Sequence, residues 1–171
     1  MRNSSLPSVT ALFAVGAALL FFSQVQAEPE SGTVTVSVGD VQVIPAGADA
    51  GQAVKAGEKV AVGSTVKTGA ASRAVIVITP RSAIRVSENS EVLIAQVDEA
   101  ATPKKIVIDV KDGSLGALLK PNAAGEIDFQ VKTPSGVAAA RGTFFAVVVE
   151  DGKGYAQVKE GRVEIIPENG N

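Results

Sequence analysis

Carboxylates are the side chains with the strongest claim to catalysis in this sequence. They stand side by side at Asp98-Glu99 and at Glu150-Asp151. Glycosidase-type chemistry needs two carboxyl groups roughly 5–10 Å apart across the scissile bond, but adjacent side chains on a strand point to opposite faces. The chain has no histidine, so it lacks the usual general base and the commonest metal ligand. We therefore interpret these acids as solvated loop residues and expect no enzymatic activity, no metal site and no cofactor.

Charge and cysteine content exclude further classes of function. The 171 residues include 16 Lys and Arg against 18 Asp and Glu, a net charge of −2. This mild acid excess argues against nucleic-acid binding, which needs a basic surface to neutralise phosphates. Without any cysteine, the chain has no disulfide and no lipid anchor, so a hydrophobic core must hold the domain. We expect that core to be aliphatic, chiefly Val, Ile and Ala.

The first 27 residues have the pattern of an export signal. Arg2 is their only charge, Ala11 to Phe22 is an unbroken apolar run, and Val25-Gln26-Ala27 is a small-residue cleavage site. The apolar run is shorter than the roughly 20 residues that cross a bilayer. We expect a cleaved signal and an exported protein, periplasmic or secreted. The alternative is an uncleaved N-terminal segment that anchors the chain.

Strand-like alternation dominates the remaining sequence. Apolar residues recur at every second position in several segments, which is typical of strands with one buried face. The clearest segments are 33–38, 84–86, 106–110 and 127–131. Glycine-containing turns separate such segments, and no window keeps a helical period beyond two turns. The pattern predicts one all-β domain, with a linker at 28–31 before it and a disordered tail at 167–171.

One short element occurs three times in the chain. Its copies are centred on Gly39, Gly113 and Gly161, and each reads as a strand, a tight glycine corner and a second strand. A positive φ angle explains the glycine, because that conformation costs a residue with a Cβ about 1–2 kcal/mol. Such corners suit a wound β-structure better than a flat open sheet, which would leave long unprotected edges.

The segment Phe144–Val149 is apolar at every position. A strand of this kind is either covered on both faces or exposes an apolar stripe. Two interpretations therefore stay open: a central strand beneath a second layer, or a partner-binding face formed by Phe144, Ala146 and Val148. In both, we expect Phe145 to lie in the core.

Arg141 and the Thr133-Pro134-Ser135-Gly136 segment could be structural or functional. A buried arginine needs a carboxylate or several carbonyl groups around it. Arg141 would then tie the entry of a strand to a neighbouring loop, or it would bind an anionic ligand. The four-residue segment fits a type I or II turn, in which the proline fixes φ at the second position.

Together these motifs resemble the FecR domain family. The matching pieces are Gly57–Gly69, Ser82–Val86, Val131–Pro134, Arg141-Gly142-Thr143-Phe144-Phe145 and Val158–Val163. The resemblance spans residues 32–166. It departs from the family at Thr79-Pro80-Arg81, where an Asp-Gly turn is usual. The family-motif residues, which we interpret as structural, are Thr133, Pro134, Arg141, Gly142, Thr143, Phe145 and Gly161.

The resemblance implies a fold close to a right-handed β-helix, with a β-sandwich or jelly roll as the alternative. It also implies an exported module of the cell envelope that binds another protein or an envelope component. Iron-signalling members carry a cytoplasmic anti-sigma region and a membrane helix before this domain, and we expect this chain to lack both. The alternative function is that of a periplasmic signal-transducing partner of an outer-membrane receptor.

Overall fold

The computed structural model describes residues 31–120 and 127–167, except for the side chains at positions 31, 141–143 and 160–162. Within these ranges every regular element is a β-strand, which confirms the predicted all-β class. The strands are β1 (Ser31–Val38), β2 (Val41–Ile44), β3 (Gln52–Ala53), β4 (Lys59–Ala61), β5 (Thr65–Thr68), β6 (Arg73–Thr79), β7 (Ser82–Val86), β8 (Ser90–Asp98), β9 (Lys104–Leu119), β10 (Ile127–Thr133), β11 (Gly136–Glu150) and β12 (Lys153–Pro167). None of the described residues forms a helix long and apolar enough to cross a membrane.

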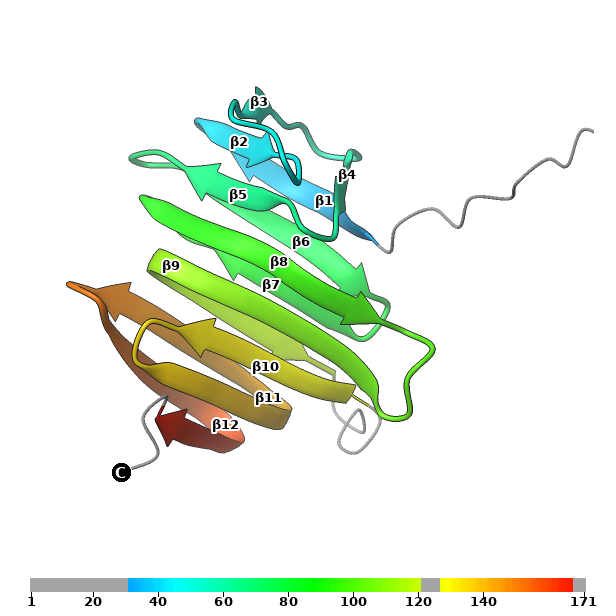
Figure 1. The fold of residues 1–171 in the computed structure, drawn as a ribbon, viewed down its shortest axis with the longest axis vertical. Coiled ribbons are helices and arrows are strands. Elements are labelled where there is room, and N and C mark those ends of the chain that lie inside the picture. The colour runs from blue at the N-terminus through cyan, green and yellow to red at the C-terminus, as the bar shows by residue number, and fades with distance from the viewer. Residues whose placement is uncertain (1–30, 121–126, 168–171) are drawn as a thin grey trace, which may run out of the picture.

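The strands form one sheet that folds over on itself into two layers (Figure 1). The order along its main path is β3-β2-β5-β8-β9-β7-β6-β1-β4. Strand β9 connects the layers, because its first half pairs with β8 and β10 and its second half with β7 and β11. Strands β2, β5, β8 and β10 lie in front in Figure 1, and β1, β6 and β7 lie behind them.

The direction of pairing sets this fold apart from a β-helix. All pairs among the described strands are antiparallel except β9 with β10, which is parallel. A β-helix stacks parallel strands, whereas here the chain doubles back at almost every step. The chain does wind between two layers, as its glycine corners predict. The outcome is a curled, mostly antiparallel two-layered sheet, closer to the sandwich alternative.

A single hydrophobic cluster fills the space between the layers. Inward-facing residues alternate with outward-facing ones along each strand, as the period-two pattern predicts. The cluster is mostly Val, Ile and Ala, with two phenylalanines in addition. Phe129 and Phe145 are fully buried, and their ring centroids lie 6.0 Å apart in an edge-to-face arrangement. The predicted burial of Phe145 is confirmed.

Two glycines allow the chain to pass from one layer to the other. Gly39 lies between β1 and β2 with a φ angle of +79°, and Gly113 lies within β9 with a φ of +85°. The predicted positive φ is confirmed at both positions. Gly113 bends a continuous strand, however, and does not separate two strands. The corner is therefore a bend that leaves the strand pairing on either side intact.

A buried serine packs beside each corner glycine. The Asp40 N–H donates to Ser72 Oγ at 2.8 Å, and the Ser114 N–H donates to Ser90 Oγ at 2.9 Å. Each serine hydroxyl in turn donates to the carbonyl oxygen two residues earlier in the chain. The residues just before the serines, Ala71 and Asn89, themselves have positive φ angles of 51° and 49°. These part-buried N–H groups at the corners thus receive a side-chain partner in place of a ladder bond.

The two corners are hydrogen-bonded to each other. The Asn89 N–H donates to the carbonyl of Gly69 at 3.1 Å, and the Ser90 N–H donates to Oγ1 of the buried Thr68 at 3.1 Å. In addition, the Gly69 N–H donates to the carbonyl oxygen of Asp40 at 2.9 Å. We call this connected set the corner column; its residues are Asp40, Thr68, Gly69, Ser72, Asn89, Ser90 and Ser114.

The third predicted corner can be compared only through strand register. Phe144 pairs with Glu160, and the chain then reaches Thr143 on one strand and Gly161 on the other. The register shifts between Arg141 and Phe144, so the ladder assigns no single partner to Gly161. The side chains at positions 141–143 and 160–162 lie outside the described residues, so the φ angle predicted for Gly161 stays a prediction.

Replacing Phe145 with alanine should lower the free energy of unfolding by about 3–5 kcal/mol, because a fully buried phenyl ring is removed. The adjacent Phe144 is a matched control, since its side chain is 43% exposed. Phe144→Ala should cost clearly less in the same denaturant titration. Equal losses for the two variants would contradict the assignment of faces on β11.

Replacing Gly113 with alanine should destabilise the domain by more than the φ penalty alone. A Cβ at this position would lie 2.3 Å from Ser90 Oγ and 2.6 Å from Ser90 Cα, so the corner must shift. Gly47→Ala is the control, because Gly47 has a similar φ of +76° but no atom within 4 Å of an added Cβ. We expect a loss of about 1–2 kcal/mol for the control and a larger one for Gly113→Ala in thermal unfolding. Similar losses would show that the serine contact is unimportant.

Candidate binding surface on the β11–β12 hairpin

Strands β11 and β12 form a long hairpin at one end of the molecule (Figure 1). Their pairing runs from Glu150 with Lys153 at the tight turn to Gly136 with Pro167 at the far end. Asp151 and Gly152 form the turn with positive φ angles, which is typical of a two-residue hairpin loop. The first half of β11 also pairs with β10, and its second half pairs with β9. The hairpin thus contributes to both layers.

The two faces of β11 differ in exposure. Phe145, Val147 and Val149 are buried, whereas Phe144 is exposed and Ala146 and Val148 are half-buried. The strand is therefore not covered on both sides by the described residues. The structure favours the second interpretation of this apolar segment, that of an outer apolar face, although binding of a partner there stays a prediction.

Neighbouring strands extend this outer face. Leu118 of β9 pairs with Phe144, and Tyr155 of β12 pairs with Val148. Directly opposed residues of an antiparallel pair share one face of the sheet. Leu118 is 50% exposed and Tyr155 is 54% exposed. We call the five residues Leu118, Phe144, Ala146, Val148 and Tyr155 the outer stripe. A lysine borders it, since Lys159 Nζ lies 5.9 Å from the centroid of the Phe144 ring.

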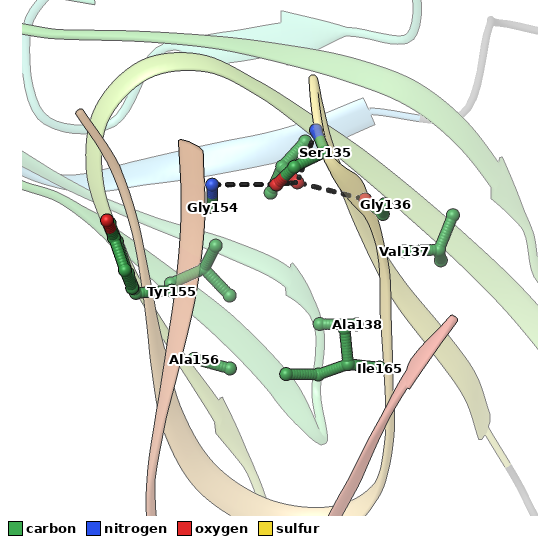
Figure 2. Close-up of a pocket in the computed structure, with 10 residues that line it drawn as sticks. Ser135, Gly136, Val137, Ala138, Gly154, Tyr155, Ala156 and Ile165 are labelled. Atoms are coloured by element: carbon green, nitrogen blue, oxygen red, sulfur yellow. Dashed lines mark hydrogen bonds between the residues drawn. The ribbon is translucent and has the colours of Figure 1, made fainter. Parts of the chain in front are cut away.

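The Thr133–Gly136 turn fastens the hairpin to β10. Thr133 Oγ1 donates to the Gly136 carbonyl at 3.0 Å and accepts the Ser135 N–H at 3.3 Å. Ser135 Oγ accepts the N–H of Gly154, at the start of β12, at 2.7 Å (Figure 2). These bonds support the structural interpretation of the Thr133–Gly136 turn, because they tie the end of β10 to the start of β12.

A small hollow lies on the inner side of the hairpin (Figure 2). Ala138, Val147, Ala156 and Ile165 line its apolar part. Its enclosed volume is about 20 Å³, which is room for about one water molecule. Pockets for small ligands are usually of several hundred cubic ångströms. The hollow is therefore a packing gap left by alanine and glycine, and it is too small for a metabolite.

A second, open hollow lies beside the first corner. Arg73, Arg85 and Glu88 are among the residues that line it. The Glu88 carboxylate accepts the N–H of Ala71 at 2.8 Å and so supports the turn before Ser72. Both arginines are exposed. This hollow is a wide polar surface next to the corner column.

The acidic pairs occupy two separate turns. Asp98 Oδ1 accepts the N–H groups of Ala100 and Ala101, which caps the turn after β8. Glu99 forms an ion pair with Lys104 at 3.2 Å. Glu150 and the following aspartate are exposed at the β11–β12 turn. Among the described residues, no three acidic side chains come close enough together to hold a metal ion.

The residues named from the family motif fall into two groups. Thr133, Pro134 and Phe145 are placed as described above. The backbone of Arg141, Gly142, Thr143 and Gly161 belongs to β11 and β12, but their side chains lie outside the described residues. A structural role for these four stays a prediction.

Sequence reasoning missed the corner serines. Ser72 and Ser90 each stand one residue after a positive-φ position and directly at the start of a strand. In the sequence they look like ordinary turn residues. Their relation to Gly39 and Gly113 spans more than twenty positions and depends on which strands pair. An internal comparison of Ala-Ser-Arg at 71–73 with Asn-Ser-Glu at 89–91 was the available signal, and it is a weak one.

Comparison with protein families identifies the chain. The model described as FecR protein matches residues 64–164, which is more than half of the sequence. This chain belongs to the FecR family. The match begins at Ser64, just before β5, and ends within β12, so that β1 to β4 lie outside it. No curated protein and no solved structure gave a significant match. A FecR domain indicates a signalling-related, typically periplasmic module that acts with other proteins.

Proposed function

We propose that this FecR domain is a non-enzymatic, exported binding or structural module of the bacterial cell envelope. The outer stripe is the observation that carries the proposal. It brings Leu118, Phe144 and Tyr155, each at least 43% exposed, onto one face over three neighbouring strands. Large exposed apolar side chains gathered on one face of a soluble domain are typical of protein–protein contact sites.

The chemistry of this surface suits a protein partner better than a small molecule. The stripe lies on the regular face of a sheet, with an aromatic ring at each end and a lysine at its border. Aromatic residues contribute much of the energy at protein interfaces, because they bury a large area with few rotatable bonds. The inner hollow of the hairpin is too small to compete as a ligand site.

The proposed domain organisation follows from the same role. Residues 1–27 would direct export and be removed, residues 28–31 would link, and residues 32–166 would form the FecR domain, followed by a short tail. Because the chain has no cysteine, its folding in an oxidising compartment would need no disulfide formation, and its stability comes from the hydrophobic core.

Family membership favours one alternative function. FecR-type proteins are signalling-related, so the partner of the outer stripe could be an outer-membrane receptor whose state this domain transmits. The two functions differ in the partner and not in the surface. Identification of the partner therefore decides between them.

Site-specific photocrosslinking in the native host tests the proposed surface. A photoreactive residue in place of Phe144 should give a crosslinked adduct that contains an envelope protein, because the side chain lies in the stripe. Val38 is the matched control, since it is also an exposed apolar residue but lies on β1, far from the hairpin in the sheet order. An adduct that appears equally from both positions, or from neither, would count against the outer stripe.

Export can be checked separately by mass. The chain expressed from its full sequence should be recovered from the periplasm or medium with an intact mass that lacks residues 1–27, because Val25-Gln26-Ala27 has the form of a cleavage site. Recovery of the full-length mass in the membrane fraction would instead support the anchored alternative.

A further inference from the structure

Strand β12 leaves one long edge of the sheet open. It has 15 residues and, among the described strands, pairs with β11 alone. The ends of the main path are different, because β3 and β4 have two and three residues. An edge strand presents unpaired N–H and C=O groups to any strand that approaches, and proteins usually shorten, charge or cover it. The edges at β3 and β4 are short, whereas β12 is not.

The apolar core reaches this edge without a cover. Val158 pairs with the buried Phe145, and Ile165 pairs with the buried Ala138. Both therefore point to the inner side, where the hydrophobic cluster lies. Even so, Val158 is 42% exposed and Ile165 is 59% exposed. Each layer thus ends in an inward-facing apolar side chain that meets solvent at the edge.

The outer side of the same edge carries two opposite charges. Lys159 lies over the ring of Phe144, which places its side chain on the outer face. Glu164 pairs with Ala139, a neighbour of the inward-facing Ala138, so that its side chain is outward as well. Both charged residues are exposed.

The two apolar and two charged residues on this edge are complementary to the same four residues on a second copy of the chain. The β11–β12 ladder shows that β12 is bulged between positions 158 and 160. If two β12 strands pair antiparallel about a two-fold axis at position 162 and keep this bulge, Val158 lies opposite the partner's Ile165. In the same register Lys159 lies opposite the partner's Glu164. Symmetry creates each pair twice. The apolar pairs fall on the inner side and the charged pairs on the outer side, so both kinds match.

Neighbouring registers do not share this match. A strand can slide only in steps of two positions if inner residues are to stay opposite inner residues. One such step places Lys159 opposite Arg162 of the partner subunit, which are like charges. The step in the other direction places Lys159 opposite the partner's Ile166. Of these three registers, only the first places Val158 opposite Ile165 and Lys159 opposite a glutamate.

We propose that the chain forms a two-fold symmetric dimer through antiparallel pairing of its β12 edges, with Val158 against Ile165 and Lys159 against Glu164. Each layer of one copy then continues into the opposite layer of the other, and the two cores join across the edge. The association closes at two copies, because it uses the one long open edge found among the described strands. This surface is the rim of the hairpin, and it meets the outer stripe on the face only at Lys159, which borders both.

Charge exchange between the two positions tests the register. We expect the full chain, as exported, to sediment as a dimer at concentrations on the order of 100 μM, in the range of a weak to moderate complex. Lys159→Glu and Glu164→Lys should each weaken the dimer by about tenfold or more, because each places like charges opposite each other twice. The double variant should dimerise like the original chain, since both pairs are restored in reverse.

Mixing the two single variants gives the sharpest readout. In a heterodimer of Lys159→Glu with Glu164→Lys, both cross-strand pairs bring a glutamate opposite a lysine. The mixture should therefore form a dimer at concentrations at which neither variant does so alone. A structural effect of either substitution on its own fold would not be repaired by mixing. Native mass spectrometry distinguishes the heterodimer, because the two variants can be given different isotope labels.

Three results would overturn the proposal. The first is a monomer at the concentrations above, which would leave the edge to a strand of another protein. The second is a dimer that none of the charge variants weakens. The third is a pair of weakened variants that mixing fails to rescue. Ile165→Lys gives an independent variant, because a charge on the inner side of an edge blocks strand addition; it should be monomeric with unchanged circular dichroism. The photocrosslinking at Phe144 is unaffected by these outcomes.

Discussion

The fold depends on how part-buried backbone groups find hydrogen-bond partners where the chain passes from one layer to the other. A strand that bends by a sharp angle loses ladder hydrogen bonds at the bend, and a buried N–H without a partner is costly. At Gly39 and Gly113 the positive φ makes the bend, and the hydroxyl of a serine from another strand accepts the N–H that follows. The serine leaves room only for glycine at each corner, because a Cβ on either glycine would lie 2.3 Å from the serine oxygen.

The corner column determines what lies on either side of it. Because Thr68, Ser90 and their backbone neighbours link the first corner to the second, β5 and β8 stay in one layer while β6 and β7 stay in the other. The two layers then face each other across an aliphatic core whose residues need no polar partner. The two halves of β11 pair with β10 and with the second half of β9, so the inner side of the hairpin closes the core and its outer side is left open. The exposed position of the outer stripe therefore depends on how the chain divides between the two layers.

Local patterns predicted part of this structure well. Alternation along 106–110 and 127–131 identified strands and their buried faces, and the glycine corners at positions 39 and 113 were found by comparing the chain with itself. Strand direction was not predictable, because period-two patterning is the same in parallel and antiparallel sheets. The exposure of Phe144 was left open for a related reason: an apolar run does not reveal whether a second layer covers it. Ser72 and Ser90 were missed because their function depends on long-range pairing, which no local window contains.

The long strand β9 has a consequence for cooperativity. Among the described strands, β1 to β8 pair with one another and with β9, and β10 to β12 do the same, but no strand of the first set pairs with one of the second. Backbone hydrogen bonding between the two parts of the domain therefore passes through residues 104–119 alone. A disturbance of the hairpin can reach the N-terminal part along this strand or through the shared core. A force or a partner acting on β12 would therefore release the last three strands as far as β9, while β1 to β8 keep their pairing.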